Sequence, residues 1–445
     1  MLLRFELGNF LSFDKKQEFT LFPGNQKKKS ERLTNTRNGK LLNLSVIYGA
    51  NASGKTNFIR SMAFSKELIL KGIDKLKYGD EYFKNNSENK DKESYFEYEI
   101  IVDDQAYAYG FKVNLDKKKI IGEWLYELNK KEEKCIYDLS FDDSDENSID
   151  ELYSDNERFL LLKDDISEMD NSLILSEVVR RKYYQNDNSF IIFKEIYNWF
   201  ENDLRIVSPS GSPGPIDEIF KDDLKDNILD MLKKFDTGIK DFSYISRSKE
   251  ESAIPKFILD DFLDKTTSEN KENFGIVKSK DHLYRVKVTN ELNKKNIEIK
   301  ELLFKHSNEK DSPLFMLSEE SDGTKRLIEL MTLMSEENNS KTFIIDEIDR
   351  SLHPQLTYKF LQLFLNKKNQ NQLIASTHES MLLDQELLRR DEIWFIHKNS
   401  KTMASEIYSL DKFKERFDKD IHKAYLEGRY GAVPLFKEFD CMKVE

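Results

Sequence analysis

The chain has 445 residues, of which 38% are hydrophobic and 34% charged, so it can bury one or two large cores under a strongly solvated surface. It has no apolar run near the ~20 residues of a membrane-spanning helix, and charges interrupt "MLLRFELGNF" where a signal peptide would be apolar. We therefore expect a cytoplasmic protein without membrane contact. Two distant cysteines argue against a disulfide framework or zinc site, and the net charge of −12 disfavours coating the whole surface with nucleic acid.

The first elements are predicted to be two antiparallel strands. The stretch "LLRFELGNFLSFDKKQEFTLF" alternates apolar and polar residues on either side of Asp14-Lys15-Lys16, as two strands joined by a turn do. A third strand, "LSVIYG", leads into the most specific motif of the chain.

That motif is "VIYGANASGKTNFI", Val46 to Ile59, in which Gly49-x4-Gly54-Lys55-Thr56 fits the phosphate-binding P-loop between a strand and a helix. The glycines let the backbone approach closely, so that N–H groups and the positive helix end face phosphate oxygens. Lys55 is predicted to contact the β- and γ-phosphates of ATP, and the Thr56 hydroxyl to ligate Mg²⁺. The predicted nucleotide-binding residues are Gly49, Ala50, Asn51, Ala52, Ser53, Gly54, Lys55, Thr56 and Asn57.

After a helix expected from Thr56 to about Leu70, three more strands are predicted in "SYFEYEIIVDD", "QAYAYGFKVNL" and "IIGEWLYELNK". The acidic stretch from Leu139 to Asp170 predicts either an exposed excursion or a solvated helix face, and helical patterns follow up to "SPSGSPGP". We expect three segments: the first half of an ATPase domain at 1–138, an inserted mainly helical or mixed region at 139–307, and the second half at 308–445.

The stretch "LSEESDGTKRLIEL" runs from small polar residues directly into a helix. Ser321 and Gly323 could offer a hydroxyl and backbone N–H groups to a phosphate at this helix start. Because one P-loop already surrounds the nucleotide of its own chain, a second such helix start predicts contact with ATP bound by a partner subunit. A simple N-cap is the alternative.

Two carboxylates follow the next core strand. In "KTFIIDEIDRSLHP", an apolar strand ends in Asp346 and Glu347, and ligands bind at the carboxyl edge of a parallel sheet. We predict that Asp346 holds Mg²⁺ and that Glu347 polarises the attacking water. Two surface acids after a core strand are the alternative.

A second core strand, in "NQLIASTHES", ends in Ser376, Thr377 and His378. Its place about thirty residues after the acid pair favours His378 as a sensor of the γ-phosphate. A structural histidine is the alternative, and that is the interpretation we give to His353.

The order "GANASGKT", "SEESDGT", "IIDEID", "STH" resembles the ATP-binding-cassette (ABC) ATPases of the Rad50, SMC, RecF and OLD type, with Walker A, signature, Walker B, D-loop and H-loop in sequence. The start "FELGNFLSF" resembles their "NF-x-SF". With "LHP" and "GRYGAVPLF", Gly428 to Phe436, the chain is more closely similar to AAA15-type ATPases of bacterial defence systems, including subunits of PARIS, Septu and AbiL. The motif "SDGTK" departs from the double glycine of transporter signatures.

The resemblance implies an α/β fold of the P-loop ABC-ATPase type, with a mixed core sheet, an antiparallel β-subdomain and an inserted mainly helical region. It also implies a Mg²⁺-dependent ATP hydrolase in which Lys55, Glu347 and His378 are catalytic. Ser321 and Gly323 would form the signature that acts on a partner's ATP. The implied partners are a second copy or a higher homo-oligomer and a separate effector, with DNA or a phage component left open.

The leading hypothesis is an ATPase that dimerises head to tail around two ATP molecules and controls an effector in anti-phage, abortive-infection defence. The alternative is a DNA-repair or chromosome-maintenance ATPase of RecF or Rad50 type that binds DNA, and a transporter ATPase is weaker. OLD-type relatives carry a nuclease after the ATPase, whereas 67 residues follow His378 here, so we expect a separate effector.

Overall fold

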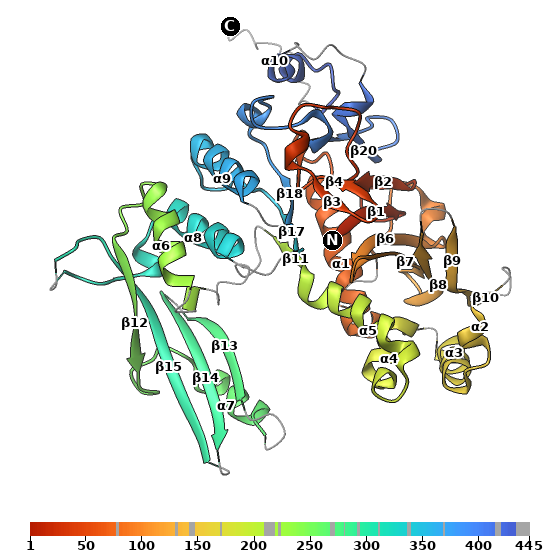
Figure 1. The fold of residues 1–445 in the computed structure, drawn as a ribbon, viewed down its shortest axis with the longest axis horizontal. Helices are drawn as coiled ribbons and strands as arrows, with labels where there is room; N and C mark the ends of the chain where they lie inside the picture. The colour runs from red at the N-terminus through yellow and green to blue at the C-terminus, as the bar shows by residue number, and fades with distance from the viewer. Residues whose placement is uncertain are drawn as a thin grey trace, which may run out of the picture. The chain divides into compact units, whose positions relative to one another are not determined.

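The chain divides into two units in the computed structural model (Figure 1). The first contains Met1–Pro209, Asn339–Ile348 and Leu361–Glu445, and the second contains Ser210–Asn338 and Asp349–Phe360. These units are not the three segments expected from the sequence, whose division at 138 and 307 stays a prediction. The structure describes residues 1–76, 80–129, 132–141, 147–169, 171–208, 219–220, 224–267, 272–279, 281–291, 294–309, 312–335, 340–367, 370–413 and 420–432.

A six-stranded mixed sheet forms the core of the first unit. Its order is β11-β17-β18-β5-β19-β20, with parallel neighbours except for the antiparallel pair of β19 and β20. The central strands are wholly buried and mostly apolar, as expected for parallel strands covered on both faces. The bounds are Leu44–Tyr48 (β5), Leu204–Val207 (β11), Thr342–Ile345 (β17), Gln372–Ser376 (β18), Ile393–Lys398 (β19) and Ser405–Ser409 (β20).

A seven-stranded sheet with antiparallel neighbours forms the β-subdomain of the same unit, in the order β10-β9-β8-β7-β6-β1-β2. The predicted N-terminal pair, β1 and β2, and the three later strands, β6 to β8, are confirmed, whereas β9 was not predicted. The bounds are Leu2–Gly8 (β1), Gln17–Thr20 (β2), Ser94–Val102 (β6), Gln105–Asn114 (β7), Lys119–Leu128 (β8), Glu133–Ser140 (β9) and Ser148–Ile149 (β10), and a separate hairpin comprises Thr34–Thr36 (β3) and Gly39–Leu41 (β4).

Helix α1 (Lys55–Lys71) contributes to one apolar core that contains residues of both sheets. The ring of Phe58 on α1 lies 5.8 Å from that of Phe5 on β1 and 5.5 Å from that of Phe19 on β2. Burying an aromatic ring against several others stabilises the fold through apolar area and edge-to-face contacts. The helix that begins at the P-loop is therefore held tightly by the β-subdomain.

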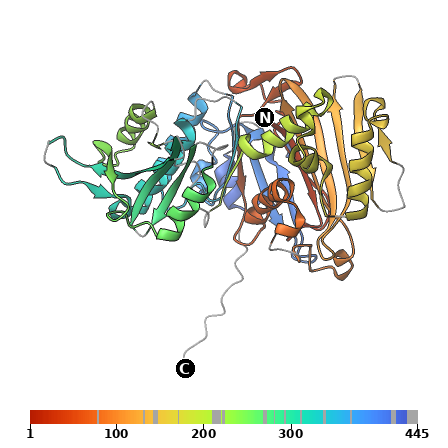
Figure 2. The ribbon, with the colours of Figure 1, turned by 90° about the horizontal axis from the view of Figure 1, so that it is seen from below.

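A helical layer follows the β-subdomain: α2 (Glu151–Ser154), α3 (Glu157–Met169), α4 (Ile174–Arg180), α5 (Ile191–Asn198) and the π-helical turn η6 (Trp199–Asp203) (Figure 2). Tyr137 of β9 stacks on Phe193 of α5, with ring centroids 5.7 Å apart. In the acidic stretch, α3 buries Phe159, Leu162 and Ile166. Helix α3 therefore has the solvated face that was one of the two alternatives, whereas the stretch also contains the end of β9, β10 and α2. Residues 142–146 and 170 of the stretch lie outside the description.

The second unit contains a sheet with antiparallel neighbours in the order β12-β15-β14-β13, and the short β16 pairs with β15. Helix α7 packs on β13 and β14 through a small apolar core, and α6 packs against α8 (Figure 1). The bounds are Lys225–Lys234 (α6), Asp241–Arg247 (β12), Lys256–Lys265 (α7), Glu272–Ser279 (β13), His282–Glu291 (β14), Lys294–Lys305 (β15), Phe315–Met316 (β16) and Asp322–Ser335 (α8).

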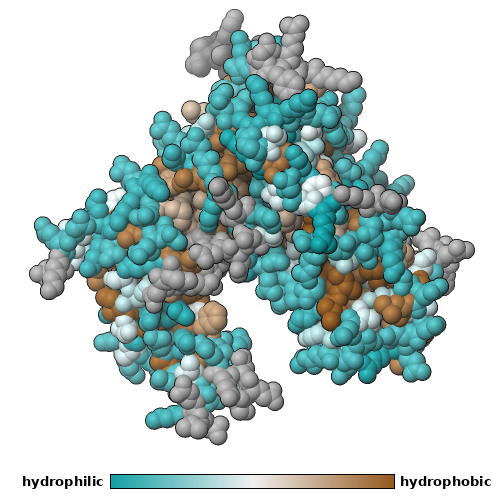
Figure 3. All heavy atoms as spheres, viewed as in Figure 1, coloured by the Kyte–Doolittle hydropathy of each residue, from teal (hydrophilic) through white to brown (hydrophobic). Residues whose placement is uncertain are grey.

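The last helices are α9 (Pro354–Asn366) and α10 (Ile421–Leu426). No helix within the described ranges is both long and apolar enough to cross a membrane. In Figure 3 the visible surface is mostly hydrophilic, in keeping with the charged fraction of 34%. The architecture is an α/β fold of the P-loop type, with a mixed core sheet and an antiparallel β-subdomain.

Candidate nucleotide-binding site

The P-loop connects β5 to α1 and takes a backbone shape that small residues permit. Gly54 has φ 116° and Ala52 has φ 60°, both in the left-handed region. A Cβ on Gly49 would lie 2.5 Å from the carbonyl oxygen of Ile396, and one on Gly54 would lie 2.4 Å from Oγ of Ser405. The loop therefore needs glycine at both positions that the motif specifies.

The side chain of Lys55 is buried and lies against the loop itself. Its Nζ donates to the carbonyl oxygens of Gly49 at 2.7 Å and of Ala50 at 3.1 Å. The next residue, Thr56, is exposed in the first turn of α1. Lys55 therefore lies against the loop and Thr56 is open to solvent, and their contacts with phosphate and Mg²⁺ stay predictions.

The start of α1 offers backbone N–H groups as hydrogen-bond donors. Its N-cap Gly54 has no side chain to accept a hydrogen bond, and the first N–H groups of a helix lack intrahelical acceptors. Nearby, the buried hydroxyls of Ser12 and Ser53 have no hydrogen-bond partner within the described part of the chain. Unpaired hydroxyls beside the start of a helix are features that a polyphosphate satisfies.

The two predicted acids directly follow β17 and are joined by one serine. Oγ of Ser376, at the end of β18, donates to Oδ1 of Asp346 at 2.5 Å and accepts from the backbone N–H of Glu347 at 2.8 Å. Asp346 is 1% exposed, whereas Glu347 is only half-buried. The buried acid is thereby fixed, and the more exposed acid takes φ 50°, in the left-handed region.

The predicted groups follow three neighbouring strands. β17 pairs with β18 and β18 pairs with β5, all in parallel, so their carboxyl ends meet at one edge of the sheet. Thr377 anchors the end of β18 by donating its N–H to the carbonyl oxygen of Ile47 at 3.1 Å. His378, the next residue, is exposed at the same edge.

The signature residues belong to the second unit. Oγ of Ser321 accepts from the N–H of Thr324 at 3.1 Å, so the N-cap interpretation describes its contact within the chain. A Cβ on Gly323 would lie 2.9 Å from the carbonyl oxygen of Ser351, in the segment after the acid pair. Glycine therefore allows α8 to approach this segment, and contact with a partner's ATP stays a prediction.

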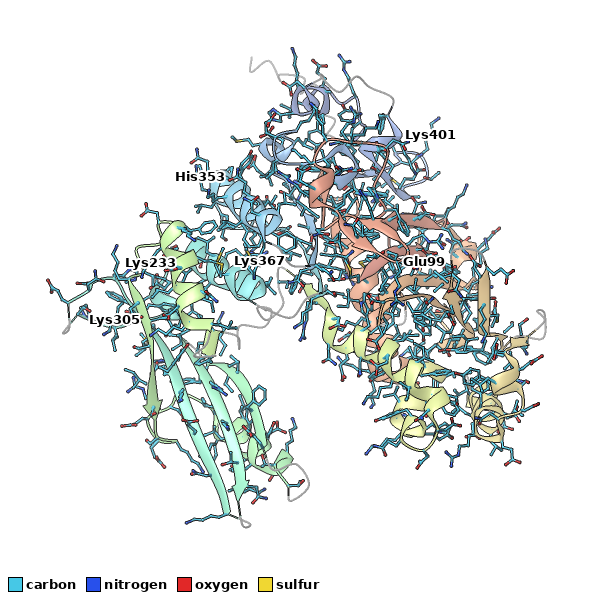
Figure 4. All side chains as sticks on the ribbon, in the orientation of Figure 1. Glu99, Lys233, Lys305, His353, Lys367 and Lys401 are labelled. Atoms are coloured by element: carbon cyan, nitrogen blue, oxygen red, sulfur yellow. The ribbon has the colours of Figure 1, made fainter. Side chains whose placement is uncertain are left out.

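His353 directly precedes helix α9 and points outward in Figure 4. Its Nδ1 accepts from the N–H of Gln355 at 3.3 Å, which agrees with the structural interpretation. Of the late motif "GRYGAVPLF", Gly428–Ala432 is described, and the rest lies outside the described residues.

Two contributions to the site were not foreseen from the sequence. Ser376 was noted at the end of its strand, but its link between Asp346 and Glu347 follows only from the pairing of β17 with β18. Ser405 donates its Oγ to the carbonyl oxygen of Ser53 at 2.6 Å from the far end of the chain, and no local pattern signals it.

The hydrogen-bond donors and oxygen ligands of this site are of the kinds that ATP and Mg²⁺ require. Backbone N–H groups and Lys55 suit phosphate oxygens, and a hydroxyl with a carboxylate supplies the hard oxygen ligands that Mg²⁺ prefers. Thr56 and Asp346 would hold the metal, and the P-loop would hold the phosphates.

Among solved structures, the chain is similar to an Smc head bound to the C-winged helix domain of ScpA, with 14% identity, coverage of 92% of this chain and 97% of the other, and a TM-score of 0.44. An SMC head domain from Thermotoga maritima is 13% identical (92% and 98% covered, TM-score 0.37). An Smc head with an extended coiled coil, bound to the C-terminal domain of ScpA and derived from Pyrococcus furiosus, is 12% identical (96% and 98% covered, TM-score 0.41). At TM-scores below 0.5 these likenesses are too distant to support a function.

No curated protein matches the chain. A family model described as "AAA domain, putative AbiEii toxin, Type IV TA system" matches residues 44–384. The match covers more than half of the chain and runs from the strand before the P-loop to just beyond His378. The chain belongs to this family of AAA-domain proteins.

Proposed function

We propose that the chain binds and hydrolyses ATP at the carboxyl edge of its core sheet. The observation that carries this proposal is the convergence of the P-loop, the acid pair and His378 on three neighbouring strands. Ligands of open α/β sheets bind at this edge. Membership of an AAA-domain family supports the same activity.

In the proposed reaction, water attacks the γ-phosphorus, the bond to the β–γ bridging oxygen breaks, and ADP and inorganic phosphate leave. Glu347 accepts the proton of the attacking water, and its partial exposure leaves the carboxylate accessible. Lys55 exchanges its loop carbonyls for phosphate oxygens and neutralises their charge. Bound Mg²⁺ supplies further neutralisation of phosphate charge.

Phosphate release from ATP tests the hydrolysis. Lys55→Ala should lower turnover by at least about 100-fold, since charge neutralisation dominates phosphoryl transfer. Lys71→Ala is the matched control, because it removes an exposed lysine from the last turn of the same helix. Equal turnover in the Lys55 variant and the control would refute the proposed site.

We further propose that two copies close around ATP and that the closed dimer controls a separate effector in anti-phage defence. The family description, which names a toxin of a toxin–antitoxin system, supports a role of this class. The exposed position of Ser321 at the start of α8 is compatible with contact to a second copy.

The defence role predicts that cells carrying the protein and its neighbouring genes plate phage less efficiently, and that Lys55→Ala restores plating. A protein encoded beside it should copurify with it. Full protection by the Lys55→Ala variant would refute control by ATP. Stimulation of hydrolysis by DNA, without an effect on phage plating, would instead favour the DNA-maintenance alternative.

A further inference from the structure

One face of the sheet in the second unit is open, whereas helix α7 covers the other face (Figure 1). The apolar core beneath α7 contains Val277 of β13, Val286 of β14 and Ile299 of β15. Successive side chains of a strand point to opposite faces of the sheet. The residues that alternate with these three therefore belong to the open face.

Two rows of paired residues cross the open face, and every member is exposed or half-buried. The first row contains Phe274, Lys287 and Glu298, and the next contains Ile276, Arg285 and Lys300. The exposed Lys278 extends the same face along β13. From Phe274 to Lys278 the open face is about 14 Å long, at ~3.4 Å per residue.

Phe274 places an aromatic ring on this face. Its side chain is 58% exposed, although burial of an aromatic ring would stabilise the fold. On the open face of an antiparallel sheet, an exposed aromatic ring is a surface on which the base of a nucleic acid stacks. The ring is therefore placed where a flat partner can cover it.

The charges around Phe274 are mainly positive, in a chain whose net charge is −12. The cations of the open face are Lys278, Arg285, Lys287 and Lys300, and its acids are Glu272 and Glu298. Each acid already has a lysine partner: Nζ of Lys287 lies 2.5 Å from Glu272, and Nζ of Lys300 lies 3.3 Å from Glu298. The acids therefore leave two cations of the face unneutralised.

These two cations are Lys278 and Arg285, and neither forms an ion pair with another residue in the described ranges. Arg285 makes one long hydrogen bond, from Nη1 to the carbonyl oxygen of Phe220 at 3.4 Å. A guanidinium group has five N–H donors, so most of them stay available for an anion. The surplus charge of the face favours an anionic partner.

We propose that the open face binds single-stranded nucleic acid, with a base stacked on Phe274 and phosphates paired with Lys278 and Arg285. Aromatic stacking combined with cations is the mode by which proteins bind single strands with little sequence preference. The face has room for about two or three nucleotides, as sheet-type RNA-binding surfaces do. An acidic peptide would satisfy the cations but has no base to stack on Phe274, and a duplex keeps its bases inside.

Fluorescence anisotropy of the full chain without ATP tests the proposal, so the result does not depend on hydrolysis. The probes are labelled strands of about 12 nucleotides, within the range of known single-strand sites, as single-stranded DNA, as single-stranded RNA and as duplex DNA. At least one single strand should bind with saturation and more tightly than the duplex. The comparison of DNA with RNA shows which of the two is preferred.

Phe274→Ala should weaken binding of the single strand about fivefold or more, as expected on losing one stacked base. Phe274→Tyr, which keeps an aromatic ring, should restore the affinity. Phe257→Ala is the matched control, because it removes a phenyl ring that is 72% exposed on α7, the helix that covers the opposite face. It should bind like the unaltered chain.

The double variant Lys278→Gln/Arg285→Gln should make the salt dependence of binding less steep. The slope of log Kd against log salt concentration should fall by up to about 1.4, since each phosphate contact of a single strand contributes about 0.7. Lys256→Gln/Lys265→Gln changes the charge equally at exposed positions of α7 and should leave the slope unchanged.

The absence of saturable binding by both single strands would overturn the proposal. Binding of the duplex as tight as that of the single strands, or equal competition by poly-glutamate, would also overturn it, because stacking would then have no part. Equal affinity of the Phe274→Ala and Phe257→Ala variants, or equal salt slopes of the two double variants, would place the nucleic acid elsewhere on the chain.

Discussion

Ser376 links the two acids of the proposed catalytic edge, so removing its hydroxyl should slow ATP hydrolysis. Ser376→Ala deletes the donor to Asp346 and the acceptor for the N–H of Glu347. We expect turnover to fall about 10–100-fold, the usual effect of losing a group that orients a metal-binding or catalytic residue. Steady-state phosphate release at saturating ATP measures the change.

Ser45→Ala provides the control for this variant. Ser45 is also fully buried in a core strand, but its hydroxyl has no hydrogen-bond partner in the described part of the chain. Its removal should leave turnover nearly unchanged. If both variants lose activity equally, the link through Ser376 has no special role.

Helix α4 is held to the β-subdomain by one buried carboxylate. Glu123 of β8 accepts from the hydroxyls of Tyr109 and Tyr137 and from the N–H groups of Ile174 and Leu175 at the start of α4. Burial nevertheless raises the pKa of the Glu123 carboxyl from 4.5 to about 7. The helix is therefore attached through a group that titrates near neutrality.

The sign of the pH effect follows from this pKa. The folded state holds the proton more tightly than the unfolded state, so the contribution of Glu123 to stability is greatest below about pH 4.5 and falls as the pH rises through about 7. Glu123→Gln should cost about 1–3 kcal/mol at low pH, because its amide cannot accept every donor. The difference in the free energy of unfolding between this variant and the unaltered chain should become smaller as the pH rises.

Urea unfolding of the Glu123→Gln variant and the unaltered chain across this pH range measures the difference in the free energy of unfolding. Other titrating groups contribute equally to both proteins, so their effect cancels in the comparison. Burial also raises the pKa of Glu392, to about 8, but that group is the same in both proteins. Parallel stability curves would contradict the assignment to Glu123.

Formation of a dimer should depend on ATP. Glu347→Gln keeps the shape of the side chain but cannot take a proton from water, so ATP should persist in the site. We expect this variant to double its mass when ATP and Mg²⁺ are added, as measured by light scattering after size exclusion.

Ser321→Arg in the same background should keep the variant monomeric by placing a large side chain at the start of α8. Ser248→Arg is the control, since Ser248 is also exposed and its Oγ likewise accepts an N–H three residues later. Each loses one such bond, at about 1 kcal/mol. A dimer formed by the Ser321→Arg variant, or a monomer in every condition, would contradict dimerisation through the signature.

The sequence by itself determined the elements whose signals are local. The P-loop is specified by residues close together in the sequence, from Gly49 to Thr56, and the core strands are specified by runs of apolar residues. Both could therefore be recognised before any contact was known. The same holds for Asp346 and Glu347, since an acid pair after an apolar strand must lie at the end of that strand. The fold class was implied by the family resemblance that the order of these motifs carries.

Only the tertiary structure decided which distant residues meet. The Ser376 link spans 29 residues to Glu347, and the hydrogen bond from Ser405 to Ser53 spans 352 residues. The sequence did not predict the order of strands in the second unit, because the apolar residues of β13 and β15 do not alternate along the whole strand, although those of β14 do. Strand pairing and burial join residues far apart in sequence, and no local pattern encodes these contacts.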